Sequence, residues 1–129
     1  KQINQEIEKA EEITKDNKTL FWTIALSYGG RQEIASAARQ IATKVADRKL
    51  DKNAIDDKIF ASFLYTDGIP DPDLLIRTSG EKRLSNFLLW QMAYTELFFT
   101  DILWPDFKKE HITEAINDFS KRERRYGNS

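Results

Sequence analysis

The stretch DLLIRTSGEKRLSNFLLWQ, residues 73–91, decides the fold. Its apolar start, Leu74 to Ile76, predicts a short buried strand, because continuous apolar runs are typical of strands that are covered on both faces. A polar segment with one glycine follows, and the apolar spacing after it predicts a helix from about Ser85 to Tyr94. A strand, a glycine-bearing loop and a helix in this order indicate part of a βαβ unit.

Strands and helices continue to alternate on both sides of this stretch. Further strands are expected at residues 19–26 and 97–99, and further helices around the apolar spacings of residues 2–15, 34–45, 55–64 and 112–119. The alternation predicts the α/β class, with a parallel sheet flanked by helices and right-handed crossovers.

Two loops that follow predicted strands combine glycine with arginine. Gly29-Gly30-Arg31 follows the first strand, and Gly80 lies between Arg77 and Arg83 after the second. Loops after parallel strands meet at one edge of the sheet, where ligands of open α/β folds bind. Glycine lets backbone N–H groups approach an oxygen there, and arginine can hold a phosphate with two parallel hydrogen bonds. The pattern favours an anion site at that edge.

Each of these features also has a purely structural interpretation. The first loop could simply turn the chain, and the second could be solvated, with Ser85 or Asn86 capping a helix. Glu96 has the local pattern of a surface carboxylate, and His111 that of a surface residue without chemistry. The basic run at residues 121–125 suits the C-terminus of a helix and leaves room for a second anion contact.

Length and composition limit the number of domains and the classes of partner and metal site that can be expected. The 129 residues fit one domain, and 40% hydrophobic with 12% aromatic residues predicts a packed core that includes Trp22, Trp90 and Trp104. A net charge of −1 gives no general attraction to nucleic acid, and no nucleic-acid partner is expected. The absence of cysteine excludes a disulfide scaffold and thiolate zinc sites and fits a cytoplasmic location. No apolar run reaches the ~20 residues that a transmembrane helix needs.

A family resemblance rests on five motifs. They are the stretch at 73–91 together with YGGRQEI (28–34), AYTELFF (93–99), LWPDF (103–107) and RERRYG (122–127). Together they resemble the cis-prenyltransferase family, in particular its bacterial undecaprenyl diphosphate synthases. Ser27 stands where the family pattern has asparagine. The family's Asp-Gly-Asn-Gly-Arg phosphate loop is not among these residues, so the resemblance implies that 1–129 is a partial single domain, the carboxy-terminal half, with the later strands of the fold.

The resemblance implies cis-prenyl chain elongation. Isopentenyl diphosphate is condensed onto an allylic diphosphate, usually farnesyl diphosphate, with Mg²⁺ as cofactor. The product is a long polyprenyl diphosphate carrier lipid that is delivered to the membrane for cell wall biogenesis. We therefore expect a homodimeric transferase in the cytoplasm, with peripheral membrane association as an open alternative. This half alone is expected to be inactive.

The resemblance also implies roles for single residues. Arg77, Arg83 and Ser85 match the positions that hold the diphosphate of isopentenyl diphosphate, and Glu96 matches a carboxylate at the Mg²⁺ site. Arg125 and Gly127 match a terminal Arg-x-Gly that serves the neighbouring subunit. No certain catalytic residue is expected in this half.

Two other functions remain open from the sequence. One is a non-catalytic prenyltransferase subunit or fragment that only binds diphosphate, and the other is a generic phosphate-binding module. The length of the resemblance disfavours the second.

Overall fold

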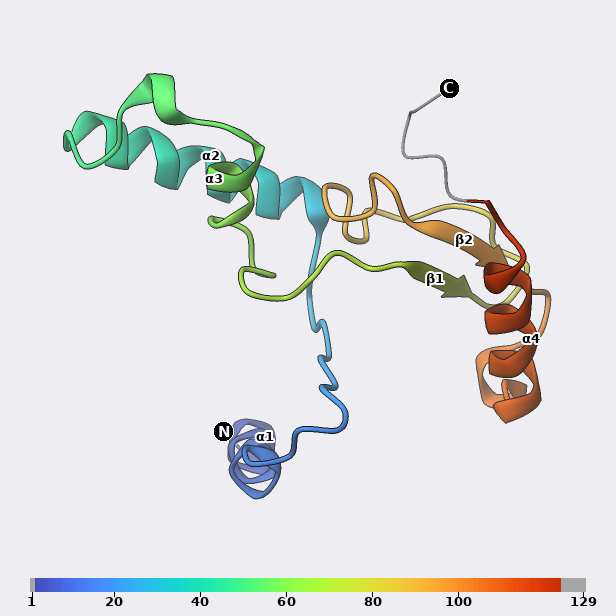
Figure 1. Ribbon diagram of the computed structural model, residues 1–129. Helices are drawn as coiled ribbons and strands as arrows, with labels where there is room; N and C mark the ends of the chain where they lie inside the picture. Colours follow the sequence, from blue (N-terminus) through green and yellow to red (C-terminus); the bar gives the residue numbers. More distant parts are fainter. Residues whose placement is uncertain (1, 124–129) are drawn as a thin grey trace.

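The computed structural model describes residues 2–123. Figure 1 shows the elements in chain order, with α1 at the end of an extended segment and apart from the other elements. Their bounds are α1 Gln2–Thr14, α2 Gly30–Ala46, η1 Lys52–Ala54, α3 Asp57–Ala61, β1 Leu74–Arg77, β2 Glu96–Phe99, η2 Trp104–Asp106 and α4 Lys109–Ser120. The helices expected at 2–15, 34–45 and 112–119 are confirmed by α1, α2 and α4, whereas α3 covers only part of 55–64.

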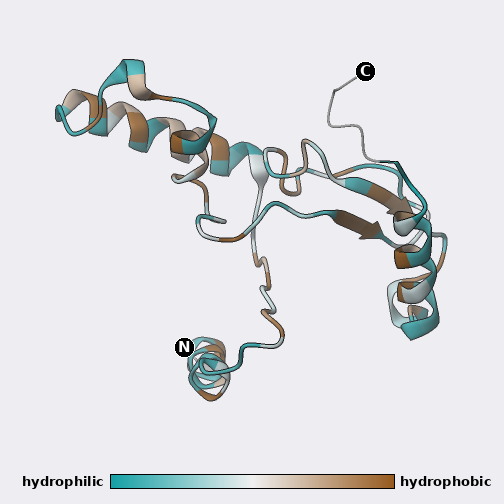
Figure 2. Ribbon diagram, in the orientation of Figure 1, coloured by the Kyte–Doolittle hydropathy of each residue, from teal (hydrophilic) through white to brown (hydrophobic). Residues whose placement is uncertain are grey.

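The sheet consists of β1 and β2, which pair in parallel from Leu74 opposite Glu96 to Arg77 opposite Phe99. Both strands match the sequence expectation, and Figure 2 shows β1 as mainly hydrophobic. Helix α4 packs against β2, and α2 packs against α3. The parallel α/β class is therefore confirmed, and the parallel arrangement places the loops after β1 and β2 at the same edge.

The buried core is small. Its buried apolar side chains are Ala37, Ile41, Leu64, Met92 and Ala115. The prediction that all three tryptophans belong to the core is wrong for two of them, because Trp22 is 82% and Trp104 is 72% exposed. Only Trp90 is half-buried, with its ring 4.4 Å from that of Phe60.

The strand expected at residues 19–26 does not form. The whole segment is exposed, including Phe21 and Trp22. A strand requires a neighbour for its backbone N–H and C=O groups. Within residues 2–123, no backbone hydrogen bond joins this segment to β1 or β2, so its apolar pattern is not realised as a strand.

The prediction of a helix from Ser85 to Tyr94 is also wrong, because residues 85–94 form a series of turns and bends. Ser85, Asn86 and Leu88 have φ angles of 49°, 65° and 43°. These values lie in the left-handed region, which a right-handed helix cannot contain. The polar groups of Asn86 bond the start of α2 instead of a helix of their own.

Candidate functional site

The candidate site lies where β1 ends and its loop folds back. Arg77, the last residue of β1, donates from Nη1 to Ser85 Oγ at 3.0 Å and to the carbonyl oxygen of Arg83. The loop is tied to the chain after β2, since Gly80 N donates to Thr100 O at 2.9 Å. Arg77, Ser85 and the backbone of Arg83 are therefore brought together, and we call this group with its loop, residues 77–86, the cradle.

The Arg83 side chain has a different partner. Its guanidinium pairs with the carboxylate of Glu81, and the two side chains are 64% and 40% exposed. The two guanidinium groups expected at one anion are thus held differently, Arg77 by the cradle and Arg83 by a surface ion pair. Exposed pairs of this kind contribute only about 0–1 kcal/mol, so Arg83 can exchange Glu81 for another anion at little cost.

The second arginine-bearing loop docks onto the cradle through Asn86. Gly30 N donates to Asn86 O at 2.7 Å, and Arg31 N donates to Asn86 Oδ1 at 2.8 Å. The Asn86 amide donates in turn to Gln32 Oε1 at 3.1 Å. The two loops that the sequence placed at one edge therefore meet. Asn86 does act as a helix cap, but for α2 across the fold and not for the helix expected after it.

This contact requires glycine at position 30. A Cβ there would lie 2.9 Å from Leu89 Cγ, 3.1 Å from Leu89 N and 3.2 Å from Asn86 O. Two of these atoms belong to the backbone and cannot rotate away. Gly30 therefore permits the close approach of α2 to the cradle.

A buried carboxylate lies directly behind this contact. Glu33, in the first turn of α2, has no exposed surface and accepts hydrogen bonds from Tyr28, Tyr65 and Gln91. Sequence reasoning assigned it no role. The signal was present, because Glu33 is spaced by four residues from Ala37 and by eight from Ile41, which puts all three on the buried face of α2.

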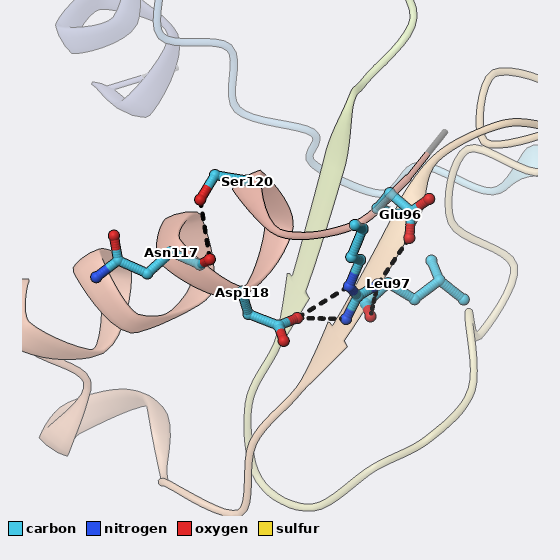
Figure 3. A network of polar contacts seen from close by, with 6 residues as sticks. Glu96, Leu97, Asn117, Asp118 and Ser120 are labelled. Atoms are coloured by element: carbon cyan, nitrogen blue, oxygen red, sulfur yellow. Dashed lines mark hydrogen bonds and ion pairs between the residues drawn. The ribbon is translucent and has the colours of Figure 1, made fainter. Parts of the chain in front are cut away.

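Glu96 begins β2, and its Oε2 accepts a hydrogen bond of 2.7 Å from Arg122 Nη1. The same guanidinium bonds Asp118 of α4, at 2.9 Å from Nε and 2.5 Å from Nη2, and the Leu97 carbonyl at 3.1 Å. Figure 3 shows this network, with Glu96 and Leu97 on the strand and Asp118 on the helix. The hydrogen bond to Glu96, followed by that to Asp118, raises the pKa of the Arg122 guanidinium above its usual value.

Glu96 and the cradle stand at opposite ends of the sheet. Glu96 pairs with Leu74 at the start of β1, whereas Arg77 ends that strand. Three residues of parallel strand separate the two positions by ~10 Å.

Mg²⁺ is commonly bound in proteins by one or two carboxylates together with phosphate oxygens. The carboxylate of Glu96 is therefore chemically suited to be a Mg²⁺ ligand. In residues 2–123 no three His, Cys, Asp or Glu side chains are grouped to hold a metal ion. Arg125 and Gly127 lie outside the described residues.

A groove of about 500 Å³ between α4 and Phe98 is a poor site for an anion. Its charged lining consists of the carboxylates of Glu110, Glu114 and Asp118 and the single ammonium group of Lys121, so the excess of negative charge would repel a diphosphate. No helix among residues 2–123 is both long and apolar enough to cross a membrane.

Comparisons with known proteins all match prenyl diphosphate synthases. A prenyltransferase family model, described as undecaprenyl diphosphate synthase, matches residues 1–127. A tritrans,polycis-undecaprenyl-diphosphate synthase (geranylgeranyl-diphosphate specific) of Methanopyrus kandleri is 51% identical over 125 residues, which cover 97% of this chain and 46% of that protein. A ditrans,polycis-undecaprenyl-diphosphate synthase ((2E,6E)-farnesyl-diphosphate specific) of Legionella pneumophila is 51% identical over 118 residues, 92% of this chain and 50% of that protein.

The fold is similar to that of a solved relative. The crystal structure of lavandulyl diphosphate synthase from Lavandula x intermedia in complex with dimethylallyl diphosphate matches with a TM-score of 0.91 at 42% identity. The match covers 97% of this chain and 54% of that chain. The chain thus spans about half the length of the curated relatives that it matches.

Proposed function

The chain belongs to the undecaprenyl diphosphate synthase family, and we propose that, within a complete cis-prenyltransferase, it forms the site that holds isopentenyl diphosphate. The complete protein would condense isopentenyl diphosphate onto an allylic diphosphate. The two relatives named above carry different allylic substrates in their names, geranylgeranyl and farnesyl diphosphate. Farnesyl diphosphate is our proposal for this protein.

The observation that carries this proposal is the hydrogen bonding of the Arg77 guanidinium. Its hydrogen bonds within the described residues all use Nη1, which leaves the donors of Nε and Nη2 for phosphate oxygens. Ser85 Oγ accepts from Arg77 and keeps its own proton to donate to an anion. Arg83, held only by an exposed ion pair, would supply the second guanidinium.

The cradle would serve the reaction by positioning. In the condensation, the allylic C–O bond breaks and diphosphate leaves with the bonding electrons, while the double bond of isopentenyl diphosphate attacks the allylic carbon. A proton is then lost from the isopentenyl unit, which leaves the new double bond. Two guanidinium groups and a hydroxyl fix the isopentenyl diphosphate so that its double bond faces the allylic carbon.

We propose Glu96 as a ligand of Mg²⁺, which when bound would neutralise negative charge on diphosphate oxygens. We also propose a homodimer in which Arg125 and Gly127 of one chain complete the isopentenyl diphosphate site of the other. The product lipid would pass from a cytoplasmic or membrane-peripheral enzyme to the membrane. The 129 residues alone should not catalyse, because the family's Asp-Gly-Asn-Gly-Arg phosphate loop, which would bind the allylic diphosphate, is not among them.

The test is an Arg77→Ala substitution in the complete protein that contains this sequence. Incorporation of radiolabelled isopentenyl diphosphate onto farnesyl diphosphate is measured with Mg²⁺, and Arg39→Ala, an exposed arginine on α2, is the matched control. We expect a KM for isopentenyl diphosphate raised by about tenfold or more in Arg77→Ala, as for loss of a charge-assisted hydrogen bond, and an unchanged KM in the control. A parent that binds isopentenyl diphosphate without turnover would favour the diphosphate-binding subunit. No binding by the parent would refute the proposal.

A further inference from the structure

Glu33 is a charged side chain with no exposed surface. Its Oε2 accepts from the Tyr28 hydroxyl at 2.5 Å and from Gln91 Nε2 at 3.2 Å. Its Oε1 accepts from Tyr65 N at 2.8 Å and lies 3.3 Å from Gln91 Nε2. Every partner is a donor, which suits the carboxylate form.

The surroundings are arranged in favour of this anion. Burying a charge is costly unless it is fully bonded, and the first turn of α2 adds the positive end of a helix dipole. Burial and then the hydrogen bond to Glu33 raise the pKa of Tyr28, so its hydroxyl stays protonated and donates. Gln91 directs its amide N–H groups at Glu33 and Thr66, although this leaves its own Oε1 buried without a partner within the described residues.

The Glu33 bonds join three segments that are far apart in the sequence. Tyr28 precedes α2, Tyr65 follows α3, and Gln91 belongs to the same turns as Asn86. The ring of Tyr28 also packs edge-on against Phe87, with centroids 5.7 Å apart. Glu33 therefore fixes the start of α2 against the turns that carry the cradle.

We propose that Glu33 is a positioning residue for the diphosphate cradle, acting through the contact between α2 and Asn86. Gly30 N and Arg31 N donate hydrogen bonds to Asn86. Asn86 directly follows Ser85 in the chain, and Ser85 orients Arg77 by accepting its hydrogen bond. Removing the charge of Glu33 should release this contact and misplace Ser85, although Glu33 itself touches no substrate. The claim that the cradle binds a diphosphate rests on the proposed function. The claim that Glu33 holds the contact between α2 and Asn86 rests on the geometry alone.

The first measurement needs no substrate. Amide hydrogen exchange at Gly30 and Arg31 reports the two bonds to Asn86 directly. In the complete protein, Glu33→Gln should lower the protection of both amides by about tenfold or more, since the loss of a charged partner opens a hydrogen bond worth roughly that factor. Glu114→Gln, the same change on the exposed face of α4, should leave both amides as in the parent. Unchanged protection in Glu33→Gln overturns the inference.

The second measurement separates positioning from a general loss of stability. Glu33→Gln should raise the KM for isopentenyl diphosphate and leave the KM for the allylic diphosphate unchanged. Ile41→Ala, a core truncation farther along α2, should lower the denaturation midpoint without changing either KM. Equal effects of both variants on both constants would overturn the positioning role.

A milder variant covers the case in which Glu33→Gln does not fold. Tyr28→Phe removes one donor and keeps the ring, so it should lower protection at Gly30 and Arg31 to a smaller extent. The absence of that effect counts against the inference. A parent that does not bind isopentenyl diphosphate refutes the proposed function instead, whereas the exchange result still decides whether Glu33 holds the α2 contact.

Discussion

Replacing Gly30 by alanine tests the close approach that joins α2 to the cradle. The added Cβ would lie 2.9 Å from Leu89 Cγ, 3.1 Å from Leu89 N and 3.2 Å from Asn86 O. Ordinary carbon contacts begin at about 3.5 Å, so each neighbour would have to move by several tenths of an ångström. The Leu89 side chain can rotate, but the two backbone atoms can move only if the bond between Gly30 N and Asn86 O opens.

Two opposing contributions decide the sign of the effect. Alanine gains up to about 1 kcal/mol over glycine within a helix, and less at the first helical position. Overpacking against a well-fitted site costs about 1–3 kcal/mol, and the lost hydrogen bond about 1 kcal/mol more. We therefore expect Gly30→Ala to destabilise the fold by about 1–3 kcal/mol in urea denaturation and to raise the KM for isopentenyl diphosphate in the complete protein.

Gly68→Ala is the control for this prediction. Gly68 has a φ of +79° and no atom within 4 Å of an added Cβ, so alanine there costs backbone strain of about 1–2 kcal/mol without touching the cradle. Both variants should lose stability, and only Gly30→Ala should change the KM. A Gly30→Ala protein with the parent's urea midpoint and the parent's KM would refute the steric reasoning.

Three further predictions concern other parts of the molecule. Glu96→Gln should raise the Mg²⁺ concentration needed for half-maximal rate, whereas Arg122→Gln should not; equal shifts in both would assign Glu96 to holding Arg122. Because the pKa of Tyr28 is raised from 10.0, the unfolded chain loses this proton first, so stability should fall as pH rises above about 10, and a Tyr28→Phe protein with the same fall in urea midpoint would contradict this. In hybrid dimers, a chain lacking residues 125–129 should regain some activity from an Arg77→Ala partner, and proven hybrids without activity would argue against a shared site.

The parts of the fold that the sequence predicted are those whose pattern is satisfied locally or by one neighbour. Helices α1, α2 and α4 follow from apolar spacing, and β1 and β2 pair with each other. The apolar segment 19–26 has the same strand pattern as β1 but no pairing partner within the described residues. The apolar pattern of a segment indicates which of its faces is to be buried, whereas strand formation also depends on a neighbouring strand with which it can pair.

The contacts among the candidate site residues could be predicted only in part. The two glycine and arginine loops do meet, but through the hydrogen bonds of Asn86, since the strand expected before the first loop does not form. The bonding between them could not be predicted, because Asn86 has the same capping preference for its own helix as for α2, and tertiary packing decides between the two. Glu33 was missed although its four-residue spacing from Ala37 marked it as buried, because a glutamate in a helix is usually solvated.

The departure from helix at residues 85–88 is best explained by this competition for Asn86. Left-handed backbone at Ser85, Asn86 and Leu88 costs roughly 1–2 kcal/mol for each residue. Three hydrogen bonds between Asn86 and the start of α2, each worth about 1 kcal/mol, offset at least about half of that cost. The conformation of the cradle therefore depends on the docking of α2, and a substitution that frees α2 should let the 85–94 segment relax toward the helix that its own sequence favours. An Asn86→Ala protein with increased helical circular dichroism and weakened isopentenyl diphosphate binding would show this coupling, and loss of binding with unchanged helix content would refute it.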